Sequence, residues 1–286
     1  MLNKVLGVNL RTLALKELNT AGRSLGFTLT QRHRGIHEAR KAIRRLRAIL
    51  ILAGGDLGPS SVLIAVELQS LLRRLSDVRD AHVVVKTMEA LIGEEPEADR
   101  RKSMRRIGRK LVERRATILL EATKGTKSLQ ASREKLAEMR DVCKSLPWES
   151  IRLERLRAAI AKSEKRADRL AKGAAAQRED IEQLHSWRRK LRRLRHQLQF
   201  LAKIPDWPTN VQNTSSGKGP KSIEKLTDIL GTILDLELLE SAVLSHAASM
   251  LEEQDLVCHV AKTAADDARR VLQDLISRGN VLMADQ

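Results

Sequence analysis

Aromatic residues and cysteines are both scarce in this chain of 286 residues. It contains three Trp, two Phe and no Tyr, whereas proteins that hold single-stranded nucleic acid commonly stack the bases on aromatic side chains. Two of the five, Trp187 and Phe200, are better explained as core residues of a helix. Only Cys143 and Cys258 could form a disulfide, and nothing in the sequence indicates that they meet, so an oxidising compartment is not indicated.

Long hydrophobic runs are missing as well. The N-terminal segment is interrupted by Lys4, Arg11 and Lys16, and no uncharged apolar stretch approaches the roughly 18 residues that a membrane-spanning helix needs. We therefore predict a cytoplasmic protein that has no membrane partner.

Signatures of catalysis and of metal binding are absent from the sequence too. The chain has no G-x-x-x-x-G-K-[ST] phosphate loop, and it has no cluster of acids that would hold catalytic metal ions. A nucleophilic triad cannot be assembled, and His33, His82, His196, His246 and His259 share no metal-ligand spacing. The sequence therefore predicts a protein that is not an enzyme, with no catalytic residues, no metal site and no cofactor.

Positive charge is what the sequence has in abundance. Lys and Arg number 53 against 36 Asp and Glu, which gives a formal net charge of +17 at pH 7 and a pI of about 10.4. Such a balance points to a polyanionic partner or to an anionic membrane surface. Hydrophobic residues make up 42% of the chain, enough for a sizeable core. Because the apolar helical stripes are needed for that core, we favour the polyanion.

The hydrophobic pattern is that of an all-α protein. Apolar residues recur at steps of three and four from end to end, and the alternation typical of strands is nearly absent. Segments rich in Gly, Pro and Ser mark the breaks between helices. They leave eight long helices and a short one at 128–142, and the long ones are predicted near 8–26, 30–53, 60–92, 97–123, 148–173, 177–203, 221–250 and 253–278.

The second half of the chain resembles the first. HEARKAIRRLR, which starts at His37, aligns without gaps on HSWRRKLRRLR, which starts at His185, and six of eleven positions are identical. Each copy is followed by a related segment, LSDVRD from Leu75 and LGTILD from Leu230, and the two segments share their first Leu and last Asp. Two motifs in the same order at similar separation indicate duplication of a four-helix unit.

Both copies predict a helix with two different faces. Successive helical residues advance by about 100°, so the basic residues of HEARKAIRRLR lie on one side and its Ala, Ile and Leu lie on the other. Between Glu182 and Asp206 the second copy contains no acid at all. Two like charges roughly 7 to 8 Å apart repel by roughly 0.5 kcal/mol even in water. Cations crowded on two such helices therefore favour a bound polyanion.

The paired H-x-x-R-[KR]-x-[IL]-R-R-L-R helices, each followed by L-[SG]-x-x-x-D, resemble the CHAD domain, the conserved-histidine α-helical domain. The resemblance covers residues 8–279. It implies two pseudo-symmetric four-helix bundles, one in residues 1–145 with a short linking helix and one in residues 146–286, whose basic helices face a central channel that binds inorganic polyphosphate. The polyphosphate-binding residues that it implies are His37, Arg40, Lys41, Arg44, Arg45, Arg47, His185, Arg188, Arg189, Arg192, Arg193 and Arg195.

The sequence departs from the family pattern in two places. The usual L-G-x-x-R-D reads LSDVRD in the first half, with Ser76 in place of the glycine, and LGTILD in the second, with Leu234 in place of the arginine. Arg79 thus has no counterpart in the second half, which leaves its role open. A further basic run at 100–115, with nine Lys or Arg and one acid, either extends the anion site or forms an exposed outer face.

The prediction for function is a stand-alone polyphosphate-binding protein that acts as a scaffold, sensor or granule-targeting module, in the cytoplasm or on polyphosphate granules. The chain lacks the E-x-E-x-K motif of the triphosphatase domain that often accompanies this family. Two alternatives stay open. One is a helical protein that binds nucleic acid, which the scarcity of aromatic residues disfavours, and the other is a weak phosphotransfer or polyphosphate-hydrolysing enzyme.

Overall fold

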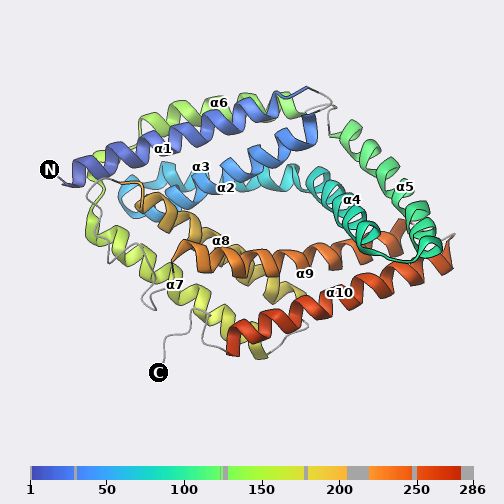
Figure 1. Ribbon diagram of the computed structural model, residues 1–286. Coiled ribbons are helices and arrows are strands. Elements are labelled where there is room, and N and C mark those ends of the chain that lie inside the picture. Colours follow the sequence, from blue (N-terminus) through green and yellow to red (C-terminus); the bar gives the residue numbers. More distant parts are fainter. Residues whose placement is uncertain are drawn as a thin grey trace.

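The computed structural model describes residues 2–28, 31–122, 124, 128–176, 180–204, 219–246 and 250–277 of the chain. Within these ranges every regular element is a helix (Figure 1), which confirms the predicted all-α class. The elements are α1 (Leu2–Leu25), α2 (Arg32–Leu57), α3 (Pro59–Arg74), α4 (Ser76–Glu94), α5 (Ala98–Glu121), α6 (Leu129–Lys144), the short 3-10 helix η3 (Trp148–Ser150), α7 (Leu153–Ala176), α8 (Ile181–Leu201), α9 (Pro220–His246) and α10 (Leu251–Ser277).

The single helix predicted at 60–92 is wrong, because the chain forms two helices there. α3 ends just before Leu75 and α4 begins just after it, with Leu75 at φ −91° and ψ 4°. The Ser76 hydroxyl donates to the Arg73 carbonyl and so competes with the helical hydrogen bonds. Asp77 in the first turn of α4 favours a helix start there. The break allows α4 to leave α3 and to pack against α5 and α9.

α2 and α8 carry the two basic motifs, and the apolar face of each is buried as the pattern predicts. Ala39, Ile43 and Leu46 of α2 are no more than 1% exposed, and Leu191 and Leu194 of α8 are fully buried. The two helices contact each other, and α2 also contacts α1, α3 and α7. Burial of these apolar faces is favourable, and it fixes the rotation of both helices and with it the direction of their basic faces.

Figure 1 shows how the other helices surround this pair, with α1 and α6 along one edge, α7 and α10 along the opposite edge and α5 at one end. Contacts recur in both halves: α1 packs on α2 as α7 packs on α8, and α4 packs on α5 as α9 packs on α10. α4 also contacts α9, as α2 contacts α8. The duplication itself, the repeats at 1–145 and 146–286 and a channel through the molecule stay predictions.

The buried apolar residues form two clusters, and each cluster draws on both halves of the chain. The larger one takes most of its residues from α1, α2, α3, α6, α7, α8 and the first part of α9. The smaller one combines α4 and α5 with α10 and the second part of α9. Trp187 and Phe200 belong to the larger cluster and are at most 2% exposed, which confirms them as core residues. Each core thus depends on helices from both halves.

Candidate anion-binding site

A pocket of about 520 Å³ opens between α2, α3, the start of α4 and α8. Eight Lys or Arg side chains line it, and none of the described residues that line it is an acid. The lining residues are Arg40, Arg44, Arg47, Gln69, Leu72, Arg73, Ser76, Ser186, Arg189, Lys190, Arg192, Arg193 and His196. Both copies of the basic motif therefore contribute to one concave surface.

Arg44 of α2 and Arg192 of α8 have the most strongly lowered pKa values among the arginines of the pocket. Burial, followed by the charges of Arg192 and Arg40, lowers the pKa of Arg44 to about 8. Burial, followed by the charges of Arg188 and Arg79, lowers the pKa of Arg192 to about 9. Both guanidinium groups still carry their charge at pH 7. The electrostatic cost of holding them together therefore persists until an anion neutralises them.

Arg40 and Arg188 occupy the same position in the two basic motifs and have equivalent partners. Arg40 Nη1 donates to the carbonyl oxygen of Leu72, and Arg188 Nε donates to the carbonyl oxygen of Thr227 at 3.1 Å. Leu72 and Thr227 each lie three residues before the leucine that opens an L-[SG]-x-x-x-D segment. One N–H of each arginine thus joins a basic helix to its neighbour. This contact uses only one of the five N–H donors of the guanidinium.

Gly231 lies directly against Arg188. A Cβ atom on Gly231 would come within 2.5 Å of Arg188 Nη2 and 3.1 Å of its Cζ, so a side chain there would displace the guanidinium. The corresponding residue of the first half, Ser76, has a side chain and itself lines the pocket. Arg40 lines the pocket as well, whereas Arg188 does not. The half that has Ser76 in place of the family glycine thus has its arginine, Arg40, in the lining of the pocket. The half that keeps the glycine has its arginine, Arg188, outside that lining.

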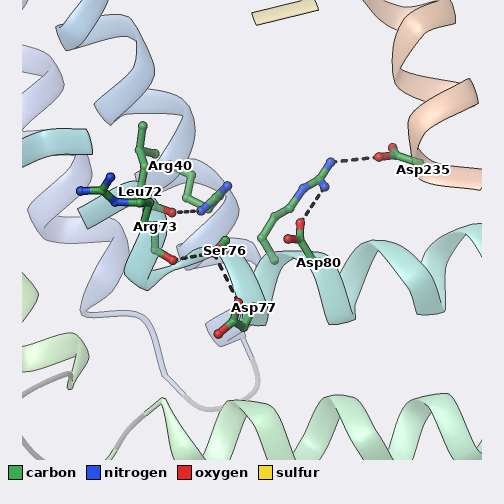
Figure 2. A network of polar contacts seen from close by, with 8 residues as sticks. Arg40, Leu72, Arg73, Ser76, Asp77, Asp80 and Asp235 are labelled. Atoms are coloured by element: carbon green, nitrogen blue, oxygen red, sulfur yellow. Dashed lines mark hydrogen bonds and ion pairs between the residues drawn. The ribbon is translucent and has the colours of Figure 1, made fainter. Parts of the chain in front are cut away.

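Arg79 lies between two aspartates that hold corresponding positions in the two halves. Its Nη1 is 2.9 Å from Asp80 Oδ1 and its Nη2 is 3.1 Å from Asp235 Oδ1, contacts that appear as dashed lines in Figure 2. One arginine therefore serves both carboxylates. The residue that corresponds to Arg79, Leu234, is only 3% exposed, and a second arginine would bring another cation to carboxylates that already have one. Arg79 joins α4 to α9 and is not a lining residue of the pocket.

Six of the twelve predicted binding residues line the pocket and six do not. Those that line it are Arg40, Arg44, Arg47, Arg189, Arg192 and Arg193. Arg45 instead forms an ion pair with the buried Glu17 of α1, with 2.8 Å between Nη2 and Oε2. Arg195 pairs with Glu224 of α9 at 2.9 Å. Because Arg45 and Arg195 each already form an ion pair with a glutamate, these two are weaker candidates for phosphate binding.

His37, Lys41 and His185 are exposed residues outside the pocket. The side chain of His37 is 60% exposed, and its Nε2 lies 4.0 Å from Glu38 Oε1. Partial burial is the main cause that lowers the pKa of both histidines, and neighbouring cations lower it further, while Glu38 and Glu182 act in the opposite direction. A bound polyanion would counter those cations, so both histidines remain predicted ligands at the rim of the basic faces.

Several residues of the pocket were missed at the level of sequence, namely Gln69, Leu72, Arg73, Ser76, Ser186, Lys190 and His196. Arg73 and Lys190 add positive charge. A signal existed for both of them. Arg73 and Arg74 form a basic pair immediately before LSDVRD, and Lys190 stands inside the second motif at the position of Ala42 in the first. A search restricted to positions that are basic in both copies passes over them.

The basic run at 100–115 contributes no lining residue to this pocket. Arg100 pairs with Glu95 at 3.3 Å, and Arg106 pairs with Glu253 of α10 at 2.8 Å. These ion pairs hold the start of α5 and its contact with α10. The part of the run that they involve therefore serves packing rather than the pocket.

These features define an all-helical protein in which two similar basic helices concentrate their charge in one pocket. The family model of the CHAD domain matches residues 27–244, and the chain belongs to this family, as its motifs predict. The family is associated with polyphosphate binding in general. A comparison with curated proteins finds no match. None of the helices in the described ranges has the length and apolar character needed to cross a membrane.

Proposed function

We propose that the protein binds inorganic polyphosphate in the pocket between α2 and α8 and serves as a scaffold, sensor or granule-targeting module rather than as an enzyme. The lining of the pocket carries the proposal, because it combines eight Lys or Arg side chains with no acid among its described residues. A polyphosphate chain is anionic along its whole length, so every part of it can meet such a lining. The cytoplasm, including polyphosphate granules, is the proposed location.

The spacing of the arginines supports a linear ligand. Arg40, Arg44 and Arg47 follow one another at steps of about one helical turn, and each turn rises about 5.4 Å. Arg189 and Arg192 line the pocket from α8. Guanidinium groups grip phosphate oxygens in charge-assisted and often bidentate hydrogen bonds. Successive phosphates of one chain can therefore be held from both helices.

Nucleic acid fits this pocket less well. Trp148, Trp187 and Phe200 are at most 2% exposed, so these three rings are not available for stacking on bases. A duplex also presents its phosphates on a broad convex surface, whereas the cations of this pocket line a concave one. The same positive charge would still attract any polyanion without specificity.

Competition separates the two ligands. Long-chain polyphosphate should displace labelled duplex DNA or RNA from the protein when both are present at equal phosphate concentration. Binding of polyphosphate should also weaken steeply as salt increases, because each neutralised phosphate releases counterions. Displacement of polyphosphate by nucleic acid at equal phosphate would favour the nucleic-acid function instead.

A second assay tests the non-catalytic part of the proposal. The protein is incubated with long-chain polyphosphate, Mg²⁺ and a nucleoside diphosphate, and the chain length is followed by gel electrophoresis. We expect no shortening of the chain and no nucleoside triphosphate. Shortening that is lost together with binding in a pocket variant would show that the same site is catalytic.

A further inference from the structure

Two histidines outside the pocket stack on each other where α2 meets α4. The ring centroids of His33 and His82 are 4.8 Å apart, and the ring planes are inclined by 12°. In both rings Nδ1 is buried and finds no hydrogen-bond partner within the described ranges. Neither histidine lines the pocket, so the pair lies outside the pocket described above.

The titratable groups whose charges lower the pKa values of this pair are cations or can become cations. Arg115 of α5, Lys86 of α4 and His37 of α2 all act on His82. Arg115 also acts on His33. Three helices therefore carry positive or protonatable groups whose charge acts on the stacked rings.

Three acids on these helices and on their neighbours already have basic partners. The pairs are Glu17 with Arg45, Glu89 with Lys86, and Asp235 with Arg79. Arg115, by contrast, forms no ion pair with any residue that the structure describes. The cation beside the histidine pair is thus without a counterion from the chain in these ranges.

The second half of the chain places a carboxylate at the corresponding position. His82 and Glu237 each lie seven residues after the leucine that opens their L-[SG]-x-x-x-D segment. Glu237 of α9 forms an ion pair with Arg269 of α10, and α10 packs on α9 as α5 packs on α4. Where the second half pairs a glutamate with an arginine, the first half has His82, on which the charge of Arg115 acts.

We propose that His33, His82 and Arg115 form a second anion-binding site, which takes a phosphate-type oxyanion in the role that Glu237 fills in the second half. The guanidinium and the imidazole N–H groups are donors that suit such an oxyanion. A separate phosphate group or the end of a polyphosphate chain can supply it. The site does not require that the pocket between α2 and α8 binds polyphosphate.

Anion binding at this site is coupled to protonation of the histidines. Burial, followed by the charges of His33 and Arg115, lowers the pKa of His82 to about 4. Burial, followed by Arg115, lowers the pKa of His33 as well. A bound oxyanion favours the charged imidazole and raises both pKa values. Binding therefore takes up protons, and the affinity rises as the pH falls below neutrality.

An NMR titration of the histidine ring signals in the full chain tests the proposal. The titration is run in chloride, in sulfate and in tripolyphosphate, and sulfate is included because it keeps its charge over the whole pH range. Arg44→Glu with Arg192→Glu serves as the background, so that a response separates this site from the pocket. We expect both oxyanions to raise the pKa of His33 and the pKa of His82. No change in His33 and His82 under either oxyanion would overturn the proposal.

A matched substitution comes from the second half of the chain. His82→Glu supplies the carboxylate that Glu237 provides there, so we expect it to abolish the response of His33 to sulfate and to raise the melting temperature. Arg115→Gln should also abolish the response, without the gain in melting temperature, because it removes the cation instead of pairing it. A wild-type response of His33 to sulfate in His82→Glu would show that the anion binds elsewhere.

Discussion

Arg79 and Asp235 form an ion pair, with 3.1 Å between Nη2 and Oδ1, that joins residues 156 positions apart in the chain. The same guanidinium holds Asp80 at 2.9 Å. The side chains of Arg79 and Asp235 are 21% and 28% exposed, so solvent screens the pair less than it screens a fully exposed one. One arginine thus forms ion pairs with two corresponding carboxylates where α4 contacts α9.

Replacing Arg79 with Leu, the residue at the corresponding position 234, should lower the free energy of unfolding by roughly 1 to 3 kcal/mol, because two partly buried carboxylates lose their shared cation. Asp235→Asn should cost less, since Asp80 keeps its partner. Equilibrium unfolding in urea measures both. An Arg79→Leu variant as stable as the wild type would show that this contact does not hold α4 and α9 together.

Substitution by alanine should affect stability differently at two glycines. A Cβ on Gly7 would lie 2.0 Å from the backbone oxygen of Trp148, whereas a Cβ on Gly231 would meet the mobile end of the Arg188 side chain. Gly7→Ala should therefore unfold or strongly destabilise the protein. Gly231→Ala should leave the melting temperature nearly unchanged. Alanine is the better helix former by about 1 kcal/mol, and this gain offsets the cost of displacing the end of the Arg188 side chain. Gly231→Ala should weaken polyphosphate binding a few-fold, because it displaces Arg188, whose charge acts on Arg192 in the pocket. Calorimetric melting and binding measurements on both variants decide this, and equal destabilisation would contradict it.

Acid should destabilise the fold partly through His196. This residue is 5% exposed, and burial is the main cause that lowers its pKa to about 3, with Arg195 and Arg192 adding to the effect and Gln199 opposing it. The unfolded chain titrates near 6.5 and binds more protons below that pH, so stability falls as the pH drops from about 6.5 toward 3. His196→Gln should reduce the total loss of unfolding free energy over this pH range by several kcal/mol, at roughly 1.4 kcal/mol per pKa unit.

Urea unfolding of both proteins at a series of pH values from neutral to acid tests the role of His196. The neutral amide of the variant cannot take up a proton, so its unfolding free energy should depend less on pH than that of the wild type. Parallel curves for the two proteins would assign the acid sensitivity to other groups.

His37 and His185 should make polyphosphate binding dependent on pH. Their pKa values are lowered in the free protein, first by partial burial, and a bound polyanion should raise them again. Binding then takes up protons, and affinity should rise as the pH falls from about 8 to 6. His37→Ala with His185→Ala should flatten this dependence while most of the affinity remains. Calorimetry in two buffers of different ionisation enthalpy measures the protons, and equal uptake by both proteins would exclude these histidines as ligands.

The helical class and the two basic helices could be predicted because both follow from the local spacing of apolar and basic residues. The break at Leu75 could not. Leu72, Leu75 and Val78 keep the apolar spacing of one helix and all are at most 8% exposed, so the pattern runs through the break without interruption. The side chain that competes with the helical hydrogen bonds there belongs to Ser76, a residue that occurs in unbroken helices as well.

The binding residues were predictable only in part, for a similar reason. Position on a helical face brings Arg44 and Arg192 to the pocket, and that position follows from the motif. The carboxylates of Glu17 and Glu224 that engage Arg45 and Arg195 come from other helices. Their proximity is a product of the fold, and no spacing within the motif indicates it.

Binding of long-chain polyphosphate by isothermal titration calorimetry, compared between two double variants, tests the central claim most directly. Arg44→Glu with Arg192→Glu changes the lining of the pocket. Lys162→Glu with Lys262→Glu changes the net charge by the same amount at exposed positions outside it. We predict that the first variant loses roughly a hundredfold or more in affinity, as expected when two charge-assisted contacts are removed. The second should stay close to the wild type, and both should keep their helical circular dichroism. Equal loss of affinity in the two folded variants would contradict binding in the pocket.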